Sequence, residues 1–321
     1  MDKKSYLLWS IALFLVSFFA LHAHIHERGF NYINAGNQVL RHEARLAGES
    51  PFYNPWQYRM FSTWAVELHV TAYEKLEVAA PYYSAFTHFR FAQQIIIFAL
   101  CFFYFRRFTP NHLLALTGVV LLGYAMSYSV WNSDLSFDTY TDIILFLLAF
   151  MVLERGRSPW IIPICALAGA NRETAILIPA FAGVLAIKSW WPLSIDRREM
   201  AIAVVAGVTF LAVAVGLRVY YGLAENEVAD GYKWLLLNLT DARTHFFVLG
   251  VVNICLLLPI FYFRDLTPFL RRAFLSVIPI WFVAHYVLVP VNEGRLFLVP
   301  YVVVLIPTLL HLIESGQRRQ R

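Results

Sequence analysis

The chain has 321 residues, of which 59% are hydrophobic and only 15% are charged. A soluble domain carries about 25% charged residues, so the composition excludes an ordinary water-soluble protein. The formal charge of +5 does not indicate a nucleic-acid partner, because the basic residues stand in short pairs between apolar blocks. The cysteines all lie within apolar blocks, where they are interpreted as small core residues, so neither a disulfide nor a cysteine-based metal site is expected: Cys101, Cys165 and Cys255.

The apolar blocks predict an all-α integral membrane protein, with residues 1–321 forming a single transmembrane domain. Most blocks are about 15–20 residues long, the length of helix that crosses the hydrocarbon core of a bilayer. About ten crossings are expected, in the order 6–22, 88–105, 111–129, 140–153, 158–170, 173–187, 200–219, 245–263, 273–290 and 296–313. The first block resembles a signal peptide, but it lacks a convincing cleavage site and is expected to remain as the first helix.

The charges between the blocks predict the orientation. Every second short loop is basic, and these loops contain Arg106-Arg107, Arg155 and Arg157, Lys188 with Arg197-Arg198, and Arg264 with Arg271-Arg272. The short connections on the other side carry acids, namely Asp134, Asp138, Glu225, Glu227, Asp230 and Glu293. Because cytoplasmic loops are enriched in Lys and Arg, both termini are expected in the cytoplasm of a bacterium, with the protein in the inner membrane.

The segment 158–187 has two interpretations. One long helix would place Lys188 and the Arg197-Arg198 pair outside, against the charge rule. Two short crossings that meet at Asn171-Arg172-Glu173 preserve the rule, but each reaches only about 20 Å into a bilayer of about 30 Å. The turn between them is therefore expected below the outer surface, sheltered by neighbouring helices.

The segment 23–87 is the one long extracytoplasmic loop. Residues 30–47 and 56–72 mix apolar and polar positions in the pattern of short amphipathic helices on a membrane surface. Where the first crossing meets this loop, the spacing of His22, His24 and His26 resembles a metal site. A helix that continues from the first crossing would, however, align only His22 and His26. No metal site and no other cofactor are expected.

Polar residues near the ends of the apolar blocks gather on the predicted outer side, which suggests one polar cavity that opens outward. Ionisable groups at membrane depth cost about 2.5–3.5 kcal/mol each and usually face a cavity or a partner. The candidates are Gln57, Tyr58, Arg59, Arg90, Asn132, Asp134, Asp138, Asp142, Asn171, Arg172, Glu173, Arg218, Asn292, Glu293 and Arg295.

Asn171-Arg172-Glu173 lies between two apolar halves. Asn171 suits the N-cap of the second half-helix and Glu173 suits its positive end. With Arg172, that helix start would form an anion site suited to phosphate. The alternative is a hairpin turn in which Arg172 and Glu173 pair with neighbours for packing.

Asp138 and Asp142 are four residues apart, so a helix places both carboxylates on one face. Two like-charged carboxylates held this close suit a general base, which takes up a proton, or a cation site. A solvated loop with a capping aspartate is the alternative.

Arg295 could bind a phosphate that Glu293 orients, or the two could mark a tight hairpin. Arg59 could join this site, or it could be a surface arginine of an amphipathic helix.

Four short motifs resemble the GT-C glycosyltransferases, which transfer sugars from polyprenyl-phosphate carriers outside the cytoplasmic membrane. They are Pro55-Trp56-Gln57-Tyr58-Arg59, Phe137-Asp138-Thr139-Tyr140-Thr141-Asp142, Asn171-Arg172-Glu173-Thr174 and Glu293-Gly294-Arg295-Leu296-Phe297. The long first outer loop with surface helices is also similar. In that family a catalytic acid, often Asp, stands early in this loop. This loop contains no Asp, and Glu27 is the best positional match.

The resemblance implies a GT-C-like fold and a glycosyltransferase that uses a polyprenyl-phosphate sugar or another anionic lipid as its partner. Glu27, Asp138 or Asp142 would act as the catalytic acid or base. Substrate would be bound by Arg59, Asn171, Arg172, Glu173, Glu293 and Arg295. Two alternatives stay open: a transporter of an anionic metabolite or glycolipid, which broken helices also suit, and a noncatalytic membrane assembly subunit.

Overall fold

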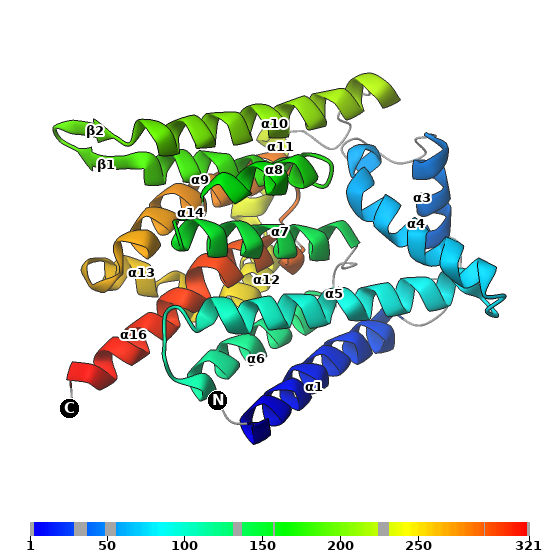
Figure 1. Ribbon diagram of the computed structural model, residues 1–321, viewed down its shortest axis with the longest axis horizontal. Helices are drawn as coiled ribbons and strands as arrows, with labels where there is room; N and C mark the ends of the chain where they lie inside the picture. Colours follow the sequence, from blue (N-terminus) through cyan, green and yellow to red (C-terminus); the bar gives the residue numbers. More distant parts are fainter. Residues whose placement is uncertain are drawn as a thin grey trace.

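The computed structural model describes residues 3–28, 37–48, 56–130, 137–156, 158–223, 231–291 and 293–319 (Figure 1). Its α-helices are α1 (Lys3–Arg28), α3 (Asn37–Ala47), α4 (Met60–Lys75), α5 (Pro81–Phe105), α6 (His112–Ser129), α7 (Phe137–Glu154), α8 (Ile161–Gly169), α9 (Leu177–Ala186), α10 (Arg197–Tyr221), α11 (Gly231–Thr240), α12 (Ala242–Val252), α13 (Leu258–Phe261), α14 (Pro268–Leu288), α15 (Leu298–Pro300) and α16 (Ile306–Arg319). Short 3-10 turns precede or link several of them, including Trp56–Tyr58, Glu173–Ile176 and Gly294–Phe297, and a π-helical segment covers Tyr301–Leu305.

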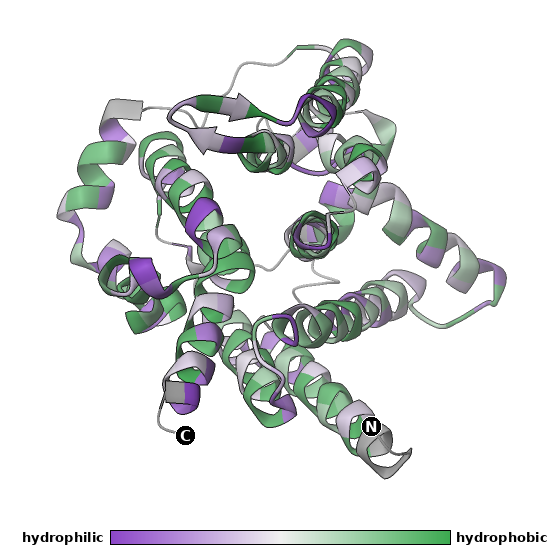
Figure 2. Ribbon diagram, turned by 60° about the vertical axis from the view of Figure 1, so that its left-hand side comes forward, coloured by the Kyte–Doolittle hydropathy of each residue, from purple (hydrophilic) through white to green (hydrophobic). Residues whose placement is uncertain are grey.

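Within the described ranges, seven helical segments are long and apolar enough to cross a membrane. They are Leu8–Glu27, Pro81–Phe105, His112–Ser129, Arg197–Tyr221, Ala242–Phe261, Pro268–Leu288 and Gly294–Arg318. Figure 2 shows hydrophobic residues along the lengths of the helices and hydrophilic ones mostly toward their ends. The predicted all-α, multi-pass membrane architecture is therefore confirmed, whereas the number of ten crossings stays a prediction.

The other three expected crossings fall on α7, α8 and α9. The helix α7 has 18 residues but carries Asp138, Asp142 and Glu154. The helices α8 and α9 have only nine and ten residues. All three are apolar helices, and in α7 the two aspartates are buried, so neighbouring elements cover the polar side chains that lipid would not tolerate.

The chain turns between α8 and α9, so 158–187 does not form one long helix. The Asn171 amide donates a hydrogen bond back to the Asp138 carbonyl at the start of α7. On the other side of the turn, α9 runs antiparallel to α10, with Glu173 bonded to Arg218 and Gly183 near Met200. The turn and the two flanking ends, 158 and 187, therefore lie at opposite ends of the bundle.

One end of the bundle gathers the basic loops, and we call it the basic end. There Arg107 lies 3.7 Å from Glu154, and Lys188 lies 2.9 Å from Asp196. The side chain of Arg272 donates to the Leu185 carbonyl. Figure 1 places the N- and C-termini toward this same end. The arrangement agrees with the loop charges in the sequence.

A short antiparallel hairpin at the basic end replaces what the sequence presents as a loop. Strand β1 (Ile187–Trp190) pairs with β2 (Leu193–Ile195), with Trp190 opposite Leu193. Trp190 and Trp191 are exposed. Tryptophans at this level suit the boundary between a bilayer and water, where their rings prefer to lie.

The helices α3 and α4 lie at the opposite end. The helix α3 begins at Asn37, so residues 30–36 of the expected surface helix lie outside the described part of the chain. The segment expected as a second surface helix is a 3-10 turn, Trp56–Tyr58, followed by α4. The main-chain N–H of Phe61 donates to the carbonyl of Ala170, which attaches the start of α4 to the α8–α9 turn.

The orientation can be tested by cysteine labelling of intact cells with a membrane-impermeant maleimide. We expect Ala47→Cys to be labelled from outside and Arg198→Cys to be labelled only after the cells are permeabilised, because these exposed residues lie at opposite ends. The three native cysteines are buried and should contribute little background. Labelling of both positions from outside would disprove the topology with cytoplasmic termini.

Candidate functional site

The centre of the candidate site is a buried ion pair between Arg59 and Asp138. Arg59 immediately precedes α4, and Asp138 lies in the first turn of α7. The Arg59 Nη1 donates to Asp138 Oδ2 at 2.6 Å, and the two side chains are 8% and 0% exposed. A bond of this kind, shielded from water, holds α4 firmly against α7.

Arg172 lies between the two aspartates of α7. Its Nε is 3.7 Å from Asp138 Oδ2, and its Nη1 is 3.7 Å from Asp142 Oδ2. The prediction that both carboxylates share one helix face is therefore confirmed. Two buried carboxylates four residues apart would repel each other, and the guanidinium between them offsets that repulsion. The Thr174 hydroxyl also donates to Asp142.

Asn171 does not have the predicted role. The residue at the N-cap position of the following turn is Arg172, and no side chain caps that turn. The Asn171 side chain instead donates to the Asp138 carbonyl at 3.0 Å. The turn is packed directly against the start of α7, and the Asn171 side chain fastens the two segments together through this bond. The second half also starts as a 3-10 turn, so the predicted capped α-helix start at Asn171 is wrong.

Glu173 connects the buried pairs to two further residues. It lies 3.5 Å from Arg59 and accepts a 2.9 Å bond from Arg218, near the end of α10. The Arg218 guanidinium also lies 4.6 Å from the centre of the Tyr58 ring, and the Tyr58 hydroxyl donates to the Gly222 carbonyl. The sequence places Arg218 on the outer side but does not identify its partner, because Glu173 is 45 residues away.

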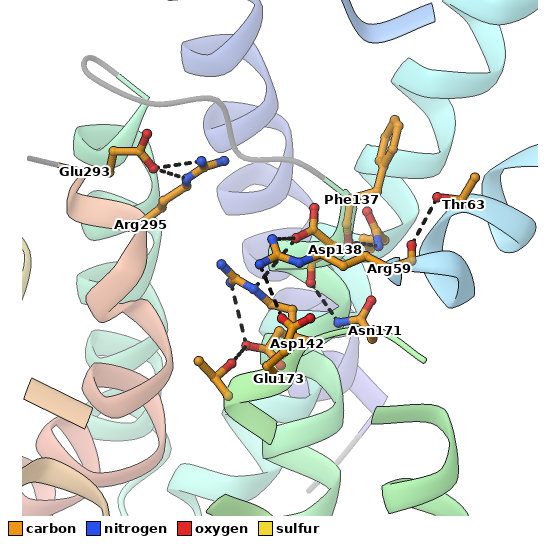
Figure 3. Close-up of polar contacts among 12 residues, drawn as sticks. Arg59, Thr63, Phe137, Asp138, Asp142, Asn171, Glu173, Glu293 and Arg295 are labelled. Atoms are coloured by element: carbon orange, nitrogen blue, oxygen red, sulfur yellow. Dashed lines mark hydrogen bonds and ion pairs between the residues drawn. The ribbon is translucent and has the colours of Figure 1, made fainter. Parts of the chain in front are cut away.

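We call these six residues the charge network: Arg59, Asp138, Asp142, Arg172, Glu173 and Arg218. They come from the residue before α4, from α7, from the α8–α9 turn and from α10, and Figure 3 shows Arg59, Asp138, Asp142 and Glu173 gathered at one place. The network brings together five of the nine predicted site residues.

The pair Glu293–Arg295 lies beside the charge network (Figure 3). Glu293 Oε2 accepts bonds of 2.7 Å from both Nε and Nη2 of Arg295. Between them, Gly294 fits because a Cβ there would come within 2.8 Å of Val251. Arg295 and Arg172 carry like charges at the same end of the bundle, so their guanidinium groups repel each other. A ligand with negative charge would relieve that repulsion.

Glu27 stands apart from the other candidates. It is exposed near the end of α1, a helix that packs on α5 and α6. No contact joins Glu27 to the charge network within the described ranges. The further candidates Asn132, Asp134 and Asn292 lie outside the residues that the structure describes.

The charges of the site balance. Four arginines face four carboxylates when the Glu293–Arg295 pair is added to the charge network. Exposure rises from the two buried aspartates through Arg295, at 13%, to Glu173, at 37%. An anion that enters must therefore compete with a carboxylate for an arginine, and in doing so it would release that carboxylate.

Comparisons of the chain with protein-family models, with curated protein sequences and with solved structures found no match.

Proposed function

We propose that the protein is a membrane glycosyltransferase of GT-C type that uses a polyprenyl-phosphate-linked sugar on the extracytoplasmic side. The observation that carries the proposal is the convergence of four arginines and four carboxylates from distant segments at one end of an apolar bundle. A lipid-linked phosphate matches this arrangement, because its apolar chain suits the membrane around the bundle and its anionic group suits the arginines at the end.

The phosphate would be bound by Arg172 and Arg295. Arginine keeps its charge in an environment of low dielectric constant and offers a planar pair of donors to phosphate oxygens. Arg295 is the more exposed of the two and would meet the ligand first. Arg59 is bound closely to Asp138 and would chiefly hold that carboxylate in position.

A carboxylate released from its arginine could then act as the general base. When the phosphate accepts hydrogen bonds from Arg172, that arginine holds Asp138 and Asp142 less strongly. In the proposed step, the acceptor hydroxyl oxygen bonds to the anomeric carbon of the sugar and its proton passes to the carboxylate. The bond from that carbon to the phosphate oxygen breaks, and the phosphate leaves with the electron pair, stabilised by the arginines.

Glu27 is the other candidate for the catalytic carboxylate, because it lies early in the first outer loop. Its exposure would allow it to meet a substrate at the membrane surface. Replacement of Glu27 and of Asp138, each in turn, would show which carboxylate the reaction needs.

Binding of a polyprenyl phosphate to the purified protein tests the role of the arginines. We expect Arg172→Lys and Arg295→Lys to bind it at least about tenfold more weakly than the wild type, because lysine keeps the charge but loses the two-donor geometry. Arg243→Lys is a matched control, since Arg243 is exposed and paired only with Asp241 among the described residues. Equal affinity in all variants would remove the arginines from the site.

Sugar transfer by the wild type distinguishes an enzyme from a transporter. The proposal requires release of polyprenyl phosphate and a glycosylated acceptor when the wild type receives a polyprenyl-phosphate sugar. Transfer should be lost in Asp138→Asn or in Glu27→Gln. Movement of the intact lipid across a vesicle membrane without transfer would favour the transporter instead.

A further inference from the structure

A polar pocket lies between α3, α4 and α5, beside the charge network but separate from it. Three of its lining residues are arginines, Arg41, Arg45 and Arg90, and none of the described lining residues is a carboxylate. Its empty volume is about 450 Å³ with the open mouth included. The described lining of this pocket is therefore basic, whereas the charge network mixes arginines with carboxylates.

Arg90 is the most buried charge in the pocket, at 1% exposure. Its Nη2 donates a long bond of 3.4 Å to Gln38 Oε1, and its guanidinium lies 4.8 Å from the centre of the Phe137 ring. Its Nε and Nη1 are buried without a hydrogen-bond partner among the described residues, and none of the described carboxylates pairs with it. A buried charge without a counter-charge costs several kcal/mol, and an anionic ligand beside Arg90 would offset that cost.

The helix α3 directs its polar face into this pocket rather than into water. Gln38, Arg41, His42 and Arg45 are spaced at i, i+3, i+4 and i+7, which places them along one face. All four line the pocket, while Leu40, on another face, is 52% exposed. A surface helix that only covered the protein would bury its apolar residues and expose its basic ones. The reversal brings two arginines to the mouth of a pocket that has a third at its floor.

The histidine of this face adds no cation at neutral pH. Burial lowers the pKa of His42, and the hydrogen bond to Glu67 opposes that effect only in part. The bond joins Nε2 of His42 to Glu67 Oε2 at 2.7 Å. Glu67 is not among the residues that line the pocket. Among the described lining residues, the cations are therefore the arginines.

We propose that this pocket is a second anion site, which binds a phosphate group carried by a lipid headgroup or present as a free phosphate. Arginines are suited to phosphate because their planar forks can donate to two oxygens at once. The hydroxyls of Ser62 and Thr63 also line the pocket. The Phe137 ring and the main chain of Arg59, which accepts a bond from Thr63, lie toward the charge network. None of the six charge-network residues lines the pocket, so the pocket is a site in its own right, whatever the charge network binds.

Binding of dihexanoyl phosphatidate to the full-length protein in phosphatidylcholine nanodiscs tests the inference. We expect Arg90→Met to weaken this binding at least about tenfold, and Arg41→Gln with Arg45→Gln to weaken it similarly. Arg243→Gln is the matched control, because Arg243 is exposed and distant in sequence, and it should bind as the wild type does. Inorganic phosphate and pyrophosphate, added as competitors, distinguish the sources. Competition at millimolar concentration indicates a site for free phosphate, and its absence indicates a lipid headgroup.

Thermal stability without added anion provides an independent readout. If Arg90 is retained for a ligand, Arg90→Met should melt at the same temperature as the wild type or higher, since it removes a buried charge without a counter-charge. Phosphatidate should raise the melting temperature of the wild type and leave that of Arg90→Met unchanged.

Two results would overturn the inference. One is equal phosphatidate affinity in the wild type and in both pocket variants. The other is binding that is lost in Arg172→Lys or Arg295→Lys but kept in the pocket variants, which would place the anion at the charge network alone. The second result would leave the proposed glycosyltransferase function intact, so the two failures are distinguishable.

Discussion

Asp138→Ala is expected to lower the free energy of unfolding by about 3–5 kcal/mol. The substitution leaves Arg59 and Arg172 buried without the carboxylate oxygen that both contact. Removing one partner of a buried pair costs much more free energy than the intact pair contributes to stability, because the remaining charge stays buried away from water. Denaturation of the purified protein in mixed micelles, followed by tryptophan fluorescence, measures the difference.

The pair Glu173–Arg218 offers the matched control. Its side chains are only partly buried, and the pair is open to solvent screening. Glu173→Ala should therefore lower the free energy of unfolding by no more than about 1 kcal/mol. If Asp138→Ala were as mild as Glu173→Ala, the buried network would not be the rigid centre that the proposed site requires.

Gly169→Ala is expected to have the second large effect, although Gly169 belongs to no polar contact. It lies in α8 where that helix crosses α10, and a Cβ there would stand 2.6 Å from the Phe210 main-chain oxygen. A backbone atom cannot move aside as a side chain can, so the two helices must separate. We expect a loss of about 1–3 kcal/mol in the free energy of unfolding, and a larger loss for Gly169→Leu.

Moving α8 away from α10 should also lengthen the Arg218–Glu173 bond of the charge network, because α10 carries Arg218 and the turn after α8 carries Glu173. Gly216→Ala, in α10, is the control. No atom lies within 4 Å of a Cβ at that position, and alanine favours a helix by about 1 kcal/mol over glycine. A loss of stability in Gly216→Ala equal to that in Gly169→Ala would show that close packing of α8 on α10 is not the cause.

The positions of the helices and the gathering of polar residues at one end could be predicted from the sequence. Apolar blocks of membrane length and basic loops are local features, and so is the four-residue spacing of Asp138 and Asp142. The pairing of these aspartates with Arg59 and Arg172 is not local, since 79 residues separate Arg59 from Asp138. The sequence therefore indicates which charges need partners but not which partners they have.

One wrong prediction and one arrangement that the sequence does not reveal have the same origin. Asn171 fits an N-cap when its own segment is considered alone, yet the carbonyl that it binds belongs to α7. The helix α3 resembles an ordinary surface helix until the burial of Arg90 shows why its polar face turns inward. In both cases the packing of a distant helix decided how a polar side chain was used.

The most direct test of the proposed site is a structure of the protein in a lipid nanodisc with a bound polyprenyl phosphate, determined by electron cryomicroscopy. The account predicts phosphate density within hydrogen-bonding distance of Arg172 and Arg295, with the lipid chain leaving between the helices and at least one of Asp138 and Asp142 separated from Arg172. Phosphate density elsewhere on the protein, with every pair of the charge network still closed, would contradict it.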